Sequence, residues 1–370
     1  MAERTASAAR PAYGGRRVAP ANWAGRALAD VLDRAAVTRS ETGDRFPLYA
    51  DPETGRWTTT GRGAWTGGFW AALLWLRARH TGEPADRAAA AACTARLADW
   101  VEADTATRGL ILWYGTALAD GDPGARELRA RAAEAALAAL HPELGLVPWG
   151  SAFGGPRLLA RVDGVPGMVG LLAAAGPDGE RAAASHLHRH LDLCAGAGGR
   201  TVPAWEFHPG AGWRAYAEPR AGWSRGDAWL LLAVADALHR PGVARIAPDR
   251  LEAAAERLAD AWTRPCTPLV PLADEGRPAG PLDTSAAAIA AVALLKLARV
   301  PGCRAASQYA YRAAAILERL VGEHLTRGML LDGCYDAGKG LAVRHELVWG
   351  DFFLALGLAA LTGLAGIGDC

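Results

Sequence analysis

The apolar residues of this chain recur at intervals of three and four positions along most of its 370 residues. That spacing places apolar side chains on one face of an α-helix, and the segments that show it are rich in Ala and Leu, which favour helix. Helix start and stop signals divide the pattern into twelve segments. They are 22–38, 65–80, 84–102, 107–120, 124–141, 164–175, 179–194, 225–239, 248–263, 284–299, 303–323 and 350–362.

The connections between these segments alternate in length. Short turns with Pro and Gly, such as Ala119-Asp120-Gly121-Asp122-Pro123, close one end of a helix pair. Longer connections rich in Trp, Gly and Pro join one pair to the next, at 39–64, 142–163, 195–224, 264–283 and 324–349. The pattern therefore predicts six helical hairpins with their long loops gathered at one end, where binding groups tend to lie.

Some of the predicted helices must be buried on most of their faces. The segment 284–299 (TSAAAIAAVALLKLAR) is built almost entirely of small and apolar residues. An inner ring of such helices wrapped by an outer ring accounts for this pattern. We predict an all-α (α/α)6 barrel with little strand, formed by residues 21–370 as a single domain, after a flexible leader at residues 1–20. The alternative is a two-domain helical array, but no Ser/Gly/Pro-rich linker divides the chain.

Composition excludes several function classes. The net charge is +1, and Lys and Arg are spread evenly among Asp and Glu, so we expect no nucleic-acid or anionic-membrane surface. No uncharged apolar run reaches the roughly 18 residues that a membrane span needs. The six cysteines lie far apart without a CxxC pair, which predicts reduced thiols in the cytoplasm. A partner protein or a homo-oligomer stays possible, because many Trp residues lie in the predicted loops.

We expect no metal and no cofactor. His186, His188 and His190 lie at spacings of two on a predicted outer helix. Neighbours at that spacing do not share a helical face, so we predict that these side chains are solvated and bind no metal.

A Gly-rich turn brings two Trp, one Arg and one Asp to the start of an apolar helix, at Trp223-Ser224-Arg225-Gly226-Asp227-Ala228-Trp229. Trp223 and Trp229 could stack on a ring-shaped ligand, and Arg225 could bind an anionic group through two parallel hydrogen bonds. In the alternative interpretation both tryptophans belong to the core and Arg225 pairs locally, with Asp227 as its partner.

Five segments together resemble the unsaturated glucuronyl hydrolases and unsaturated rhamnogalacturonyl hydrolases. They are Trp65-Thr66-Gly67-Gly68-Phe69-Trp70, Val162-Asp163-Gly164-Val165, the segment Trp223–Trp229, Asp283-Thr284-Ser285-Ala286 and Trp349-Gly350-Asp351-Phe352, in the order that the family has them. The resemblance implies a six-hairpin barrel that hydrates the double bond of an unsaturated uronic acid.

The resemblance also implies roles for single residues. Asp163 matches the general acid/base, and Arg225 would bind the substrate carboxylate. The other matching positions are expected to bind substrate: Trp65, Thr107, Trp223, Trp229, Asp283 and Trp349.

The chain departs from the family at several positions: the family's histidine falls near Pro203, and its glutamine ahead of the Trp223–Trp229 segment has no clear counterpart. Thr107 stands where the family has a second catalytic aspartate, and Asp227 stands where it has a glutamine. A single carboxyl can donate and then accept a proton, and a neighbouring carboxylate helps by raising its pKa. Asp227 would have to give that help to Asp163. Alternatively, Asp163 caps the helix that follows it.

Three functions fit these observations. The first is hydration of an unsaturated uronyl sugar. The second is a hydrolase fold recast for natural-product biosynthesis, in which an amine displaces sulfate or phosphate within one molecule to give an aziridine while Arg225 stabilises the departing anion. The third is a pseudoenzyme that only binds a ligand. The first two predict a small anionic or zwitterionic polar substrate.

Overall fold

A computed structural model of the chain describes residues 22–196 and 201–370, so the predicted leader at residues 1–20 lies outside the described residues. Each of the twelve predicted segments contains a helix, and the short helix α9 is additional. The helices are α1 (Asn22–Thr42), α2 (Gly67–Thr81), α3 (Pro84–Ala95), α4 (Tyr114–Ala117), α5 (Pro123–Ala138), α6 (Met168–Ala173), α7 (Pro177–Cys194), α8 (Ser224–Leu238), α9 (Pro241–Ala244), α10 (Pro248–Thr263), α11 (Thr284–Leu297), α12 (Ala306–Arg319) and α13 (Val348–Thr362).

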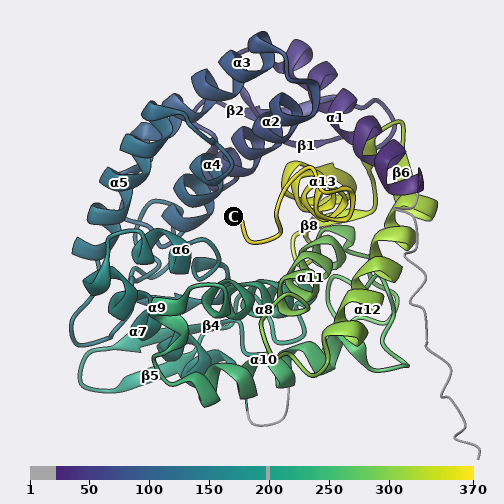
Figure 1. Ribbon diagram of the computed structural model, residues 1–370. Coiled ribbons are helices and arrows are strands. Elements are labelled where there is room, and N and C mark those ends of the chain that lie inside the picture. The colour runs from purple at the N-terminus through teal and green to yellow at the C-terminus, as the bar shows by residue number, and fades with distance from the viewer. Residues whose placement is uncertain (1–21, 197–200) are drawn as a thin grey trace, which may run out of the picture.

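The helices form two concentric rings (Figure 1). The inner ring consists of α2, α4, α6, α8, α11 and α13, and the outer ring of α1, α3, α5, α7, α10 and α12. Neighbouring inner helices pack side by side, with α6 meeting the turn Gly109–Trp113 that leads into α4, and α13 packs against α2 and closes the ring. The architecture is the predicted (α/α)6 barrel. Every residue of α11 is buried, as its small and apolar composition predicts.

The inner ring requires glycine at one close approach. A π-helical turn, Gly109–Trp113, leads into α4 and packs against the start of α6. A Cβ atom on Gly109 would lie 2.1 Å from the backbone nitrogen of Met168, which is far inside van der Waals contact. Only a residue without a side chain lets these two backbones meet.

The long connections, which we predicted as loops, contain nine short strands within the described residues. They are β1 (Phe46–Ala50), β2 (Trp57–Thr60), β3 (Leu159–Arg161), β4 (Ala204–His208), β5 (Gly212–Ala215), β6 (Leu325–Thr326), β7 (Met329–Leu330), β8 (Gly333–Asp336) and β9 (Leu341–Leu347). They pair antiparallel in sheets ordered β2-β1-β9-β8, β3-β4-β5 and β6-β7. Most of them are too short for a two-residue alternation to reveal them in sequence.

The strands gather where the inner helices begin. The connections that carry β1, β3, β5 and β9 lead to the first turns of inner helices, whereas short turns join the ends of inner helices to outer ones. Tyr49 of β1 pairs with Leu347 of β9, so the first and last connections meet beside each other. We call this side of the barrel the strand end.

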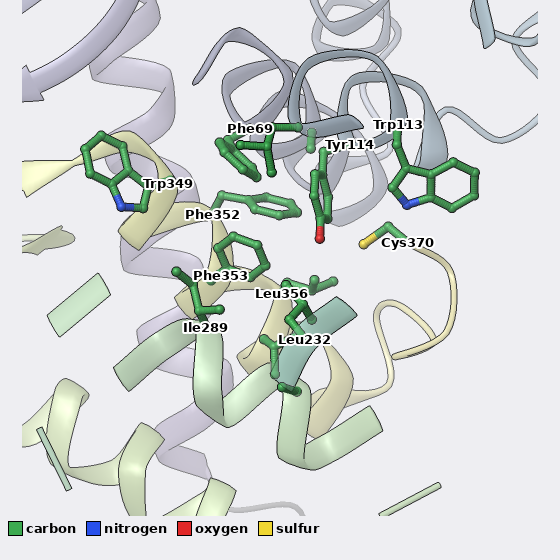
Figure 2. Packing of buried hydrophobic residues seen from close by; sticks show 14 of the residues in the cluster. Phe69, Trp113, Tyr114, Leu232, Ile289, Trp349, Phe352, Phe353, Leu356 and Cys370 are labelled. Atoms are coloured by element: carbon green, nitrogen blue, oxygen red, sulfur yellow. The ribbon is translucent and has the colours of Figure 1, made fainter. Parts of the chain in front are cut away.

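Aromatic side chains fill the middle of the ring. Phe69 lies against Phe353 with ring centroids 5.4 Å apart, and Tyr114 and Phe352 complete the group (Figure 2). After α13 the chain runs into the centre of the ring, where Cys370 lies close to Tyr114 (Figures 1 and 2). The Lys296 ammonium pairs with Asp236 at 2.7 Å and donates to the Cys370 carbonyl. The described helices include none that is both long and apolar enough to cross a membrane.

Candidate functional site

Asp163 lies at the strand end, in a single helical turn (Val162–Gly164) that follows β3. The extended backbone of Arg161 sends alternate side chains to opposite sides, so Val162 enters the core while Arg161 and Asp163 share the other side. Arg161 donates from Nε to Oδ1 of Asp163 at 3.0 Å and from Nη2 to Oδ2 at 2.9 Å. The helix α6 is capped by Gly167, so the alternative that Asp163 caps it is wrong.

The Arg161 guanidinium is also held by groups other than Asp163. It lies 4.1 Å from the ring centroid of Trp149, within the range of a cation–π interaction. The Trp149 indole is fixed in turn, because its Nε1 donates to the Gly154 carbonyl at 2.9 Å. Backbone pairing of Arg161 with Ala204 of β4 sets the position of the strand.

Two histidines of α7 pack on the buried side of this turn. His186 and His190 are buried, with ring centroids 4.4 Å apart, so the prediction that they are solvated is wrong. Residues two apart on a helix lie on different faces, but residues four apart, such as His186 and His190, lie on the same face. His186 accepts from the Val147 N–H at 3.1 Å, and its Nε2 lies 3.3 Å from the Gly164 carbonyl. It therefore ties the turn that carries Asp163 to the preceding loop.

The groups buried behind Asp163 are uncharged. Burial lowers the pKa of His190 to about 4, although the Asp163 charge opposes that shift. Burial, followed by the Asp163 charge, raises the pKa of the Cys194 thiol. The positive charge that pairs with Asp163 is therefore that of Arg161.

Thr107 lies in the same region as Asp163, but it has no free polar group. Its hydroxyl hydrogen-bonds the Thr105 hydroxyl at 2.9 Å, and the side chain is buried. The intervening Ala106 donates from its backbone to the Trp149 carbonyl at 3.1 Å and lies against Gly164. Thr107 thus brings a satisfied hydroxyl to the position where the resemblance places a carboxylate.

Arg225 is held inside the protein at the start of α8. It forms an ion pair with Asp283, donates to the carbonyls of Cys334 and Tyr335 at 2.7 Å each, and lies over the rings of Trp223 and Trp349. The side chains of Arg225 and Asp283 are 4% and 0% exposed. Asp283 also caps α11 by accepting from the Ser285 N–H at 3.1 Å. This placement favours the alternative of a local pair, and the partner that the structure gives is Asp283.

Of the four predicted tryptophans, two are partly exposed and two are buried. Trp65 and Trp349 lie 4.8 Å apart, and Trp65 Nε1 donates to the Tyr335 hydroxyl at 3.0 Å. Trp65 and Trp223 are partly exposed, whereas Trp349 is buried. Trp229 is 1% exposed and stacks on Phe69, so it packs in the core instead of forming a wall for a ligand.

The structure thus brings the predicted residues together in two clusters at the strand end. Trp65, Trp223, Arg225, Asp283 and Trp349 form one, and Asp163 and Thr107 belong to the other. Asp227 lines a small hollow together with Thr201 of the preceding loop and Arg257 of α10.

Sequence reasoning missed Arg161, Trp149 and Tyr335. For Arg161 the signal was its place two residues before Asp163, within reach of a long side chain, but the connection 142–163 was predicted as a loop. Trp149 and Tyr335 reach their clusters through long connections, and nothing local marks them.

No protein-family model and no curated protein matches this chain. Solved structures with similar folds include the unsaturated glucuronyl hydrolase from Bacillus sp. GL1, described as responsible for degradation of glycosaminoglycan, with 22% identity and a TM-score of 0.80 over 93% of this chain and 98% of the other. An unsaturated glucuronyl hydrolase specific for heparin has 20% identity and a TM-score of 0.79 over 92% and 97%. The enzyme from Streptococcus agalactiae has 17% identity and a TM-score of 0.78 over 93% and 92%.

These likenesses extend over nearly the whole of each chain, at identities that establish a shared architecture. The chain has the six-hairpin (α/α)6 fold of the unsaturated glucuronyl hydrolases.

Proposed function

We propose that this chain is an enzyme that uses Asp163 as a general acid/base on a small anionic substrate at the strand end of the barrel. The observation that carries the proposal is the placement of Asp163. Its carboxylate is partly exposed, both oxygens are oriented by Arg161, and it lies on the side of the ring where the inner helices begin. An acid/base group needs this combination of access and fixed geometry.

We propose an unsaturated uronyl sugar as the first substrate class. One similar structure, a mutant of the Streptococcus agalactiae enzyme, is described in complex with dGlcA-GalNAc6S. In hydration, the Asp163 carboxyl would give its proton to one alkene carbon while water adds to the other. The carboxylate would then take the proton that the water loses, so the carboxyl group is restored.

A second candidate is the recast reaction, and one observation favours it: Thr107 brings no second carboxylate. Arg225, which we predicted to stabilise the departing anion, is bound to Asp283 and to backbone carbonyls, so another cation has to take that role. In this reaction Asp163 would take a proton from an amine, the nitrogen would attack a neighbouring carbon, and sulfate or phosphate would leave. Arg161, which is partly exposed, would then stabilise the departing anion.

The six cysteines are free thiols, which supports our proposal that the protein works in the cytoplasm.

The deciding experiment is turnover of a Δ4,5-unsaturated glucuronyl disaccharide, followed as loss of alkene absorbance. We expect turnover by the natural chain and a loss of about 100-fold or more in Asp163→Asn, the usual contribution of general acid/base catalysis. Asp104→Asn is the matched control, since Asp104 is an exposed carboxylate at the same end that also pairs with an arginine, Arg157. Its rate should stay within about twofold.

Other outcomes separate the candidates. Equal turnover by the natural chain and Asp163→Asn would reject Asp163 as the acid/base. A folded natural chain without turnover would reject hydration, and amine-bearing sulfate and phosphate esters would then be screened. Ligand binding that persists without any reaction would indicate the pseudoenzyme.

A further inference from the structure

Two of the arginine–carboxylate pairs at the strand end contain residues of the predicted site, and they differ in access. The side chains of Arg225 and Asp283 are 4% and 0% exposed, whereas those of Arg161 and Asp163 are 20% and 16% exposed. A ligand that arrives from solvent can reach the second pair without opening the core. Arg161 is therefore the better-placed guanidinium for an anion.

The contacts of Arg161 already have the form of anion recognition. Nε and Nη2 donate in parallel to the two oxygens of one carboxylate, which is how a guanidinium binds the carboxylate or sulfate of a ligand. Asp163 occupies the place that such a ligand would take.

Arg161 can keep its position when Asp163 leaves. Its guanidinium stacks on Trp149, and its backbone is paired with β4. Asp163, in contrast, lies beyond the end of the strand, and its carboxylate is held by the hydrogen bonds that Arg161 donates. Exchange therefore requires a turn of one short side chain and no movement of the scaffold.

We propose that Arg161 is the anion-binding residue of this site, and that Asp163 blocks it as an internal competitor until an anionic substrate displaces it. The role of the released Asp163 rests on the proposed function, but binding of the anion does not. Once displaced, the Asp163 carboxyl is no longer held by Arg161 and can turn toward the bound substrate. Binding of the anion would thereby release the acid/base group.

The first test measures binding by titration calorimetry at constant ionic strength, with glucuronate and inorganic sulfate as probes. Asp163→Asn removes the competing charge, so we expect both probes to bind about tenfold tighter than to the natural chain, the equivalent of one charge-assisted hydrogen bond. Adding Arg161→Gln should abolish that gain. Arg161→Lys in the Asp163→Asn background keeps the positive charge but loses the two parallel donors, so it should retain part of the gain in affinity.

Arg157→Gln is the control, because Arg157 is an exposed arginine at the same end and is paired with Asp104. It should leave both affinities within about twofold. Circular dichroism and the melting temperature establish that each variant is folded. Affinities that do not rise in Asp163→Asn, or that do not depend on Arg161 in any folded variant, would overturn the inference.

A second readout separates this inference from the proposed function. If the unsaturated disaccharide is turned over, Arg161→Lys should raise KM by more than it lowers kcat. Turnover with an unchanged KM would reject the anion site and leave the reaction standing. Probe binding that follows the expected pattern without turnover would reject the reaction and leave the anion site standing.

Discussion

The buried pair of Arg225 and Asp283 gives a quantitative test of whether this motif serves the fold. Asp283→Asn removes the negative charge with almost no change of volume and leaves the Arg225 guanidinium 4% exposed without its ion-pair partner. Removing one partner of a buried pair costs about 3 to 5 kcal/mol, because the remaining charge is uncompensated. Arg225 keeps its two carbonyl acceptors, at Cys334 and Tyr335, so we expect the lower half of that range.

The loss is measurable by thermal and urea unfolding. Unfolding entropy is about 2.1 cal/mol/K per residue, or roughly 0.8 kcal/mol/K for a chain of 370 residues. A loss of about 3.5 kcal/mol therefore lowers the melting temperature by roughly 4 to 5 °C. Arg225→Met should cost a similar amount, because it leaves Asp283 buried and unpaired. The double variant should cost at least about 1.5 kcal/mol less than the sum of the single losses.

The control is the exposed pair of Arg264 and Asp260 on the outer ring, whose side chains are 56% and 68% exposed. Asp260→Asn should change stability by less than about 0.5 kcal/mol. A loss below about 1 kcal/mol in Asp283→Asn, or strict additivity in the double variant, would refute the assignment of this pair to the fold.

Two further predictions concern the packing around the site. Burial lowers the pKa of His190 to about 4, so the contribution of the neutral imidazole to stability is present above about pH 6.5 and is lost as the pH falls toward 4. We expect the free energy of unfolding, measured with urea, to fall by on the order of 3 kcal/mol over that range. The pH dependence should be shallower in His190→Gln. An unchanged pH dependence in that variant would contradict the assignment. Gly109→Ala forces a Cβ to within 2.1 Å of the Met168 backbone and should cost about 1 to 3 kcal/mol, whereas Gly25→Ala, with nothing within 4 Å, should stabilise α1 by about 0.5 to 1 kcal/mol. Equal effects of the two substitutions would show that the inner helices can move apart.

The helices could be predicted because their signals are local. The segment 248–263 coincides with α10 residue for residue, since Pro248 marks its start and its apolar face repeats within a few residues. The small and apolar residues that make up most of 284–299 likewise indicate burial without knowledge of its neighbours. The hairpin order follows from loop lengths, which are also visible in the chain.

The site was predicted only in part. Asp163 could be singled out by resemblance, and the structure places it where it meets solvent. The partner of Arg225 could not be found in the same way, because Asp283 lies 58 residues away and reaches it only when α8 and α11 pack together. His186 and His190 could not be assigned to the core without the loop that packs on α7.

The sequence by itself determined the helix content, the six-hairpin order and the residue types available at the strand end. These depend on spacing over a few residues, where backbone propensity and amphipathic burial act. Tertiary structure alone decided that Arg225 is buried in an ion pair with Asp283 and that Arg161 is partly exposed to solvent. That distinction depends on burial and on the distance between charges, and both arise only when connections far apart in the chain meet at one end of the ring.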